Sequence, residues 1–586
     1  MTGLSVDHRH PERVPEPKED YMRASVADRR AGLEQHFAPW QERRLEQVLD
    51  HVVERMPNRP FVVTDDRTWS YADIQDWSRQ IARGLVAAGV RPGDRVGLVM
   101  GNFPEFVAVK YAIARAGATT VPINFLNRRD ELGYVLRQSG TSVLVTMDSF
   151  RGLDYLDYLD ELEPGWEGGA GRHLGDLRRV FVFATGQARR DGADYLEDLI
   201  ELGRGTALPE TMPGPEQPSD ILYTSGTTGS PKGVLLTHDM LTRTAYGSAY
   251  SRAFADGQRV TFSLPMYHVY GYVEGMLAVV YAGGCIIPQL TFDAGETLRA
   301  IVEHEADDVL LIPTMTMSLI DELEARPREL PSLTTMISSG GYSPPWIWDK
   351  IREIFGQIEL TTGYGMSETT ATTTLTEPGG PDERLHHTNG RMRPAGAAAD
   401  PEIGGQLVQY RLVDQETGAD VGQGEVGELV ARGLGITPGY FRKPDETEAA
   451  FRHGWFHSGD LATIDEEGFI SLVGRAKDLY RCGGEQVVPK EIEDVLVGHP
   501  AVLQAHIVPL LDDRMGEVGV AWVVLRGGHT VDAEELRAWC SERLAKFKVP
   551  RHVRIIAIDE VPVTPSGRPR KFLLAKRASE ELGRQV

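Results

Sequence analysis

Hydroxyl, glycine and lysine residues are concentrated in the segment Tyr223–Val234, whose sequence is YTSGTTGSPKGV. Glycines let backbone N–H groups approach an anion closely, hydroxyl groups donate to phosphate oxygens, and Lys232 supplies a positive charge. The segment differs from the phosphate loop of ordinary nucleoside triphosphatases, because it has no Gly-Lys-[Ser/Thr] ending. A polar turn between two strands would explain the glycines and serines but not so many hydroxyl groups beside one lysine. The segment therefore predicts a phosphate-binding loop.

Four further motifs follow this segment along the chain. They are Tyr364–Glu368 (YGMSE), Trp455–Asp460 (WFHSGD), Gly474–Glu493 (GRAKDLYRCGGEQVVPKEIE) and Pro562–Arg568 (PVTPSGR). In this order and at these separations, over roughly residues 37–586, the five motifs resemble those of the adenylate-forming superfamily. That superfamily comprises acyl-CoA synthetases, carrier-protein adenylation domains and beetle luciferases. The resemblance implies that ATP and a carboxylic acid give an acyl-adenylate and pyrophosphate, and that a thiol such as coenzyme A then expels AMP.

The resemblance also implies a nucleotide site assembled from several motifs. It implies that Asp460 binds the ribose hydroxyls and that Arg475 contacts the ribose or a phosphate. It also implies that Glu368 binds Mg²⁺, because carboxylate oxygens suit a hard cation. The adenine is expected to lie against residues 340–342, with Tyr364 stacking nearby. The full predicted nucleotide-binding set is Thr224, Ser225, Gly226, Thr227, Thr228, Gly229, Lys232, Gly340, Gly341, Tyr342, Tyr364, Gly365, Ser367, Asp460 and Arg475.

The acyl site is less clearly marked in the sequence. His268, in the run LPMYHVYG, matches the family's aromatic position that shields the carboxylate and moves between the two half-reactions. A single histidine is more often structural, but this one lies within a recognisable motif. The aromatic residues expected to line the acyl site are Tyr267, Tyr270, Tyr272 and Trp346, and the small residues expected to leave room for a bulky acid are Gly271, Gly275 and Gly341.

The thiol-transfer step is implied by the motif of residues 474–493. In the family a C-terminal domain turns about a hinge, and Lys477 falls at that hinge. Gly483 and Gly484 then line the tunnel for the pantetheine arm of coenzyme A, where the missing Cβ atoms leave room for a slim thiol. A turn that enters a helix would explain the two glycines alone, but not the whole twenty-residue match. The predicted catalytic residues are His268, Glu368, Gly484 and Arg568.

Arg568 is where the sequence departs from the family pattern. The family's last motif ends in a lysine that bridges the acyl carboxylate and the nucleotide, whereas this chain has Arg568 there, and its nearest lysine is Lys571. A guanidinium is wider and longer than an ammonium and has a fixed fork geometry. Three interpretations are open: a tolerated substitution, a ligase specialised for the second half-reaction, or replacement by Lys571 through a register change that the stiff Pro569 disfavours.

Length and composition limit the remaining classes. A chain of 586 residues with 41% hydrophobic residues can form more than one domain, and a net charge of −23 argues against nucleic acid or an anionic membrane as the main partner. The three cysteines have no paired spacing, which predicts a reducing cytoplasm without structural disulfides or a zinc site. No signal peptide or long apolar run is present, so we expect a cytoplasmic protein without a membrane span.

The predicted fold is α/β. Strands and helices alternate through most of the chain, which predicts doubly wound parallel sheets. We expect a charged, partly ordered N-terminal extension at residues 1–36, and an AMP-binding N-terminal domain with a small β-barrel at residues 37–476. A mobile α+β C-terminal domain is expected at residues 477–586, and residues 206–220, with four prolines, are expected to form a linker before the phosphate loop.

The favoured function is an acyl-CoA ligase that acts on a bulky carboxylic acid in bacterial specialised metabolism, such as antibiotic biosynthesis. Because of Arg568, we expect impaired adenylation and retained thioester formation, with a companion enzyme supplying the acyl-adenylate. The alternatives are a complete two-step ligase, an enzyme that loads a carrier protein, and a non-catalytic acyl-adenylate sensor. An oligomer is compatible with the sequence but not required by it.

Overall fold

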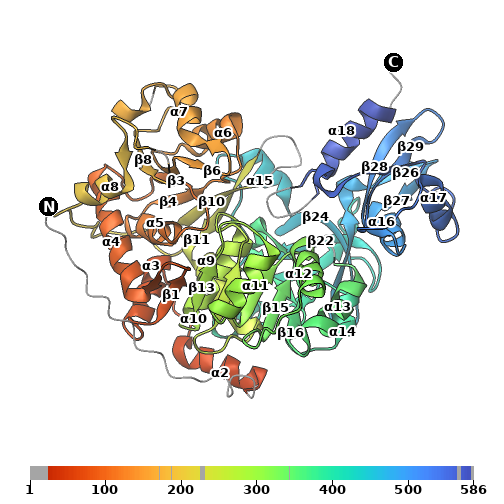
Figure 1. Cartoon of the computed structure of the whole chain (residues 1–586), viewed down its shortest axis with the longest axis horizontal. Coiled ribbons are helices and arrows are strands. Elements are labelled where there is room, and N and C mark those ends of the chain that lie inside the picture. Colours follow the sequence, from red (N-terminus) through yellow and green to blue (C-terminus); the bar gives the residue numbers. More distant parts are fainter. Residues whose placement is uncertain are drawn as a thin grey trace.

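The computed structural model describes residues 24–169, 172–186, 188–224, 231–341, 343–563 and 569–582. The chain forms a large N-terminal domain of sheets and helices and a small C-terminal domain, which is drawn in blue at one side of Figure 1. The predicted α/β class is confirmed. No helix in the described ranges combines the length and the apolar character needed to cross a membrane.

The first large sheet carries the ends of the phosphate loop. Its strand order is β11-β10-β4-β3-β5-β8-β9, and all neighbours are parallel except β10 and β11. The strands are β3 (Arg95–Val99), β4 (Thr119–Pro122), β5 (Val143–Met147), β8 (Arg179–Phe183), β9 (Asp194–Tyr195), β10 (Pro218–Thr224) and β11 (Lys232–Thr237), and the associated helices are α4 (Tyr71–Ala87), α5 (Pro104–Arg115), α6 (Arg129–Ser139), α7 (Tyr155–Leu162) and α8 (Leu196–Leu202).

The second large sheet has the order β16-β15-β14-β12-β13-β1-β2 and is parallel except for its edge strand β2. The strands are β1 (Pro60–Val63), β2 (Thr68–Ser70), β12 (Arg259–Phe262), β13 (Cys285–Pro288), β14 (Asp308–Leu311), β15 (Thr335–Ser338) and β16 (Glu359–Thr361). The helices of this part of the domain are α3 (Leu45–Val53), α10 (Ala278–Tyr281), α11 (Ala294–Glu303), α12 (Pro313–Ala325), α13 (Pro345–Phe355) and α14 (Asp382–His387). Helix α9 (His238–Ser251) contacts β10 and β11 of the first sheet.

Two smaller sheets follow. Residues 409–475, which include the predicted barrel strands, form a five-stranded antiparallel sheet with a core of its own. Its strands are β21 (Gln409–Val413), β22 (Gly427–Arg432), β23 (Phe451–Arg452), β24 (Trp455–Ile464) and β25 (Ile470–Arg475). The C-terminal sheet contains β26 (Tyr480–Cys482), β27 (Glu485–Val487), β28 (Val502–Asp512), β29 (Gly516–Leu525) and β30 (His552–Ile555), with helices α16 (Pro489–Val497), α17 (Ala533–Ser541) and α18 (Lys571–Leu582).

Two segments differ in detail from what the sequence indicated. Helix α2 (Val26–Phe37) forms the end of the extension that was expected to be partly ordered, where no helix was predicted. The Ser25 hydroxyl caps its first turn, and Leu33 and Phe37 are buried, so this helix is stabilised by a cap and by packing although its sequence is highly charged. The expected linker is also shorter, because strand β10 begins at Pro218 and pairs with both β4 and β11.

His506, on β28, gives the C-terminal domain an expected pH dependence. Burial lowers the pKa of this imidazole from 6.5 to about 4, so the folded domain holds it neutral. Between these two pH values the unfolded chain binds a proton that the folded chain does not, and stability therefore falls as the pH falls from 6.5 to 4. The shift corresponds to a loss of about 3 kcal/mol.

We expect His506→Gln to remove this component. Denaturant unfolding of the C-terminal domain, followed between pH 7 and pH 4, should show a shallower decline in the variant than in the wild type. Parallel declines would contradict the prediction.

Candidate functional site

The pairing of β10 with β11 closes the two ends of the predicted phosphate loop. Thr224 at the end of β10 lies opposite Lys232 at the start of β11. Five predicted loop residues lie outside the described residues: Ser225, Gly226, Thr227, Thr228 and Gly229. The Lys232 ammonium lies over the ring of Tyr440, with its Nζ 4.8 Å from the ring centroid. The hairpin therefore fixes where the loop begins and ends, and the loop cation lies next to an aromatic ring.

Tyr440 links the phosphate loop to the predicted metal ligand. Its hydroxyl donates to Glu368 Oε1 over 3.0 Å. Glu368 is buried in a short 3-10 turn (Ser367–Thr369), and burial raises the pKa of its carboxyl group. The Thr437 N–H donates to the Glu368 carbonyl oxygen, which fixes the backbone at this position. A buried carboxylate beside the phosphate loop is an oxygen donor of the kind that Mg²⁺ prefers.

The residues suit a metal ion that is shared with a phosphate ligand. In the described part of the chain, no group of three or more His, Cys, Asp or Glu side chains could hold a metal ion. Mg²⁺ usually binds one or two carboxylates together with substrate phosphates and water. Glu368 therefore fits a nucleotide-bound Mg²⁺ better than a permanently bound metal ion.

Asp460 and Arg475 face each other across the antiparallel pair β24 and β25. Arg475 Nε lies 3.0 Å from Asp460 Oδ1, and the Tyr364 hydroxyl donates to Asp460 Oδ2 over 2.7 Å. Asp460 is only 3% exposed. These contacts hold the carboxylate in one orientation, and they bring together three residues that are far apart in the sequence. Ser367, in the same motif as Tyr364, is also buried.

Two predicted glycines are required by the backbone of this region. A Cβ atom at Gly365 would lie 1.8 Å from the carbonyl oxygen of Ala371, so no larger residue fits there. Gly340 has a left-handed backbone with φ +88°, and a Cβ there would contact Ile312 and approach the Tyr270 ring. Gly341 has no comparable restriction, and Tyr342 lies outside the described residues.

His268 lies just before an unusual helix. The π-helix η2 (Tyr270–Leu277) is followed directly by α10, and the Tyr270 N–H donates to His268 Nδ1 over 3.3 Å. His268 is half-buried. Neighbouring Tyr267 is buried against the Phe125 ring, with the centroids 5.1 Å apart, and the Tyr270 hydroxyl donates to the Leu311 carbonyl oxygen.

Two of the aromatic residues predicted for the acyl site have other partners. The Tyr272 ring lies 5.2 Å from the ammonium of buried Lys110, in the core of the N-terminal domain. The guanidinium of Arg526, in the C-terminal domain, lies over the Trp346 ring, with its Cζ 4.3 Å from the ring centroid. Both positions are explained by packing.

The interpretation of Gly271 and Gly275 as room for a bulky acid was wrong. A Cβ atom at Gly271 would lie 2.5 Å from the Leu264 carbonyl oxygen, and one at Gly275 would lie 2.7 Å from the Phe262 ring. These glycines let the π-helix pack closely against its neighbours, and this packing is a sufficient reason for their small size. Sequence alone could not distinguish close packing from an empty pocket, because both favour glycine.

An open cleft of about 980 Å³ lies where the last motif approaches the N-terminal domain. Ile312 and the segment around residues 124–131 line it on the N-terminal side, and Val563 and Arg570 line it on the C-terminal side. Residues 564–568, Arg568 included, lie outside the described residues. Among the described residues, Arg570 Nε has no hydrogen-bond partner. The Lys571 ammonium forms an ion pair, 2.6 Å from Glu493 Oε1.

The two glycines predicted to line the thiol tunnel form the turn between β26 and β27. Cys482 pairs with Glu485, and the residues between them, Gly483 and Gly484, have φ +63° and +91°. Two left-handed residues are what a tight type I′ hairpin requires. Both glycines are exposed, and a Cβ at Gly484 would meet no atom within 4 Å. Lys477, in the short turn between β25 and β26, is also exposed.

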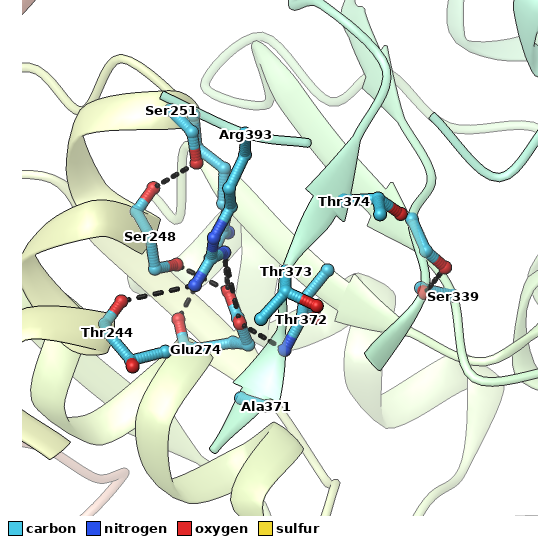
Figure 2. A network of polar contacts seen from close by, with 12 residues as sticks. Thr244, Ser248, Ser251, Glu274, Ser339, Ala371, Thr372, Thr373, Thr374 and Arg393 are labelled. Carbon is cyan, nitrogen blue, oxygen red and sulfur yellow. Dashed lines mark hydrogen bonds and ion pairs between the residues drawn. The ribbon is translucent and has the colours of Figure 1, made fainter. Parts of the chain in front are cut away.

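A buried polar network around Glu274, on the π-helix, was not foreseen from the sequence. Figure 2 shows the Arg393 guanidinium against the Glu274 carboxylate, with Arg393 Nη1 3.2 Å from both oxygens. The Ser248 hydroxyl and the Thr372 N–H donate to the same carboxylate. Burial alone would raise the pKa of Glu274, but Arg393, Arg252 and Ser248 hold it below its usual value. Tyr440 was missed as well. Neither Tyr440 nor the residues of this network lie in one of the five sequence motifs.

Comparison with known proteins fits this geometry. Residues 49–441 match the model of the AMP-binding enzyme family. The chain belongs to the AMP-binding enzyme family. Residues 491–568 match the C-terminal domain that this family carries.

Named relatives of the chain are acyl-CoA ligases. A putative acyl-CoA synthetase, YngI, from Bacillus subtilis is 32% identical over 544 residues, which cover 91% of this chain and 96% of that protein. The mitochondrial medium-chain acyl-CoA ligase ACSF2 of Danio rerio is 31% identical over 94% of this chain and 91% of its own length. The ATP-bound structure of MatB from Rhodopseudomonas palustris has a TM-score of 0.78 at 25% identity, covering 92% of this chain and all of MatB. The predicted enzyme class, an acid–thiol ligase, is confirmed, and its cofactors are ATP, Mg²⁺ and coenzyme A.

Proposed function

We propose that this AMP-binding enzyme forms the coenzyme A thioester of a carboxylic acid from its acyl-adenylate and is specialised for this second half-reaction. Adenylation is impaired, because Arg568 stands where the family's lysine is expected. A companion enzyme then supplies the acyl-adenylate. The observation that carries the proposal is the retention of the other predicted site residues around one altered cation.

The nucleotide roles follow from the contacts of the site. Lys232 and the phosphate loop would bind phosphate, Glu368 would hold the nucleotide-bound Mg²⁺, and Asp460, oriented by Tyr364 and Arg475, would accept both ribose hydroxyls. When bound, Mg²⁺ neutralises phosphate charge. Residues 340–342 would lie beside the adenine, and His268 would shield the acyl carboxylate.

The altered cation affects only the first half-reaction in this proposal. Adenylation requires a compact charge between two oxygens of different molecules, and a planar guanidinium cannot occupy the same space as an ammonium. Lys571 is a poor substitute, because its ion pair with Glu493 would have to break. Thioester formation uses a different orientation of the C-terminal domain (residues 477–586). The C-terminal domain reaches that orientation by turning about Lys477, and the turn brings Gly483 and Gly484 to the thiol.

The test compares the two half-reactions in the wild-type protein. ATP with each acid of a panel is assayed for pyrophosphate release, and the matching synthetic acyl-adenylates with coenzyme A are assayed for AMP release. Because Gly271 and Gly275 are explained by close packing and do not indicate a bulky acid, the panel should contain bulky, polycyclic and short acids. We expect coenzyme A-dependent AMP release from at least one adenylate and pyrophosphate release that is ~10²–10³ slower.

Other results would identify the alternatives. Comparable rates in both assays would show a complete two-step ligase. AMP release that requires a phosphopantetheine carrier protein would show a loading enzyme. Tight binding of an adenylate without AMP release would show a sensor.

A further inference from the structure

The backbone directly after Glu368 is strained. Thr370 and Ala371 have φ of +66° and +141°, a range that residues with a side chain rarely adopt. Each such residue costs on the order of 1–3 kcal/mol and persists only where surrounding contacts hold it. The position of the Glu368 carboxylate therefore depends on what fixes residues 370–372.

Hydrogen bonds fix this segment from two sides. On one side, the Thr370 hydroxyl donates to the Gly435 carbonyl oxygen over 2.8 Å. On the other side, the Thr372 N–H donates to Glu274 Oε1 over 3.0 Å. Glu274 is fully buried on the π-helix that begins two residues after His268, so the acceptor comes from the helix next to the predicted acyl site.

Arg393 and Ser248 hold the Glu274 carboxylate in place. Arg393 Nη1 contacts both carboxylate oxygens, and Arg393 Nη2 donates to the Thr244 carbonyl oxygen over 3.1 Å. The Ser248 hydroxyl donates to Oε2 (Figure 2). The Arg393 backbone N–H also donates to the Thr373 carbonyl oxygen, a bond that does not depend on the arginine side chain. Helix α9, the π-helix, β18 (Ala371–Thr372) and the residue after β20 (Arg391–Met392) meet at one carboxylate.

We propose that Glu274 and Arg393 are positioning residues that set the Glu368 carboxylate for the nucleotide-bound Mg²⁺. This inference rests on the proposed role of Glu368. Neither residue contacts Glu368 itself, and the pair acts through the strained residues 370–371. Groups that orient a metal ligand commonly change metal affinity by about 10–100-fold when they are replaced.

The experiment measures binding without turnover. ATP is titrated calorimetrically into the full-length protein in excess Mg²⁺ and again in EDTA, and the ratio of the two dissociation constants gives the Mg²⁺-dependent gain in ATP affinity. The test variant is E274Q/R393M, which removes both buried charges together and keeps an acceptor for the Thr372 N–H. We expect it to lose about 10-fold or more of this gain while its affinity in EDTA stays near the wild-type value. S248A should shift the gain in the same direction by a smaller factor.

Two control variants separate positioning from general damage. R44M/E46Q removes another buried ion pair, 2.6 Å long at the start of α3, and should lower the melting temperature without changing the Mg²⁺-dependent gain. E368Q should lose the gain. If E368Q keeps the gain, the role of Glu368 is wrong and the proposal falls with it. If E368Q loses it but E274Q/R393M keeps it, or loses affinity equally with and without Mg²⁺, the positioning role is wrong.

Discussion

We expect the variant Arg568→Lys to release pyrophosphate from ATP and its acid ~10²–10³ times faster than the wild-type enzyme. An ammonium at this position can lie between the acyl carboxylate and the α-phosphate, where a guanidinium is too wide. The rate of AMP release from supplied acyl-adenylate and coenzyme A should stay unchanged, because the other domain orientation carries that step. Single-turnover assays of the two half-reactions measure both rates.

Two neighbouring cations serve as matched controls for this prediction. Arg570→Lys makes the same chemical change at a residue that lines the cleft, and Lys571→Ala removes the ion pair with Glu493. Neither should accelerate pyrophosphate release. If the wild type already equals Arg568→Lys, the arginine is tolerated and the enzyme is a complete two-step ligase. If Lys571→Ala alone abolishes pyrophosphate release, Lys571 has taken over the role of the family's lysine.

Lys110→Met is expected to destabilise the N-terminal domain by about 3–5 kcal/mol. Lys110, on α5, and Asp220, on β10, are 1% and 0% exposed, and the Lys110 ammonium lies 3.0 Å from Asp220 Oδ2. It also donates to the Thr120 hydroxyl over 2.9 Å. Methionine would fill a similar volume but leave the Asp220 carboxylate buried without its counter-charge. Urea unfolding, followed at the transition of the N-terminal domain, measures the change.

The double variant Lys110→Met/Asp220→Leu should recover most of this stability, because no unpaired charge remains. Lys350→Met is the exposed comparison: its ion pairs with Glu324 and Glu353 lie at the surface and should contribute less than about 1 kcal/mol. A loss in Lys110→Met no larger than that in Lys350→Met would contradict the prediction.

Local sequence patterns were sufficient to predict most of the fold. The alternation of strands and helices was predictable because elements such as β3 (Arg95–Val99) and α16 (Pro489–Val497) each depend on a short apolar pattern with a clear start. Helix α2 was missed because its apolar side has only two large buried residues, Leu33 and Phe37, within a charged sequence. Its stability comes largely from contacts that a local pattern does not contain, such as the ion pair between Arg29 and Glu359.

The site residues also divide into those that local motifs mark and those that only the fold brings together. Asp460, Arg475 and Glu368 lie in motifs, and sequence could name them. Glu274 and Arg393 are 119 positions apart in the chain, and each looks like an ordinary charged residue until the fold brings them together. The glycines of the π-helix were misinterpreted because Leu264 and Phe262 come next to them only in the folded chain.

Arg526 and Trp346 join the two domains through a contact between a cation and an aromatic ring. Such contacts contribute about 0.5–1 kcal/mol where water has access. A free energy of this size changes the ratio of two conformations by a factor of only about 2–5. This contact alone therefore does little to hold the C-terminal domain in one orientation. The ligand that fills the site, through its unequal affinity for the two conformations, would then determine which of them prevails during turnover.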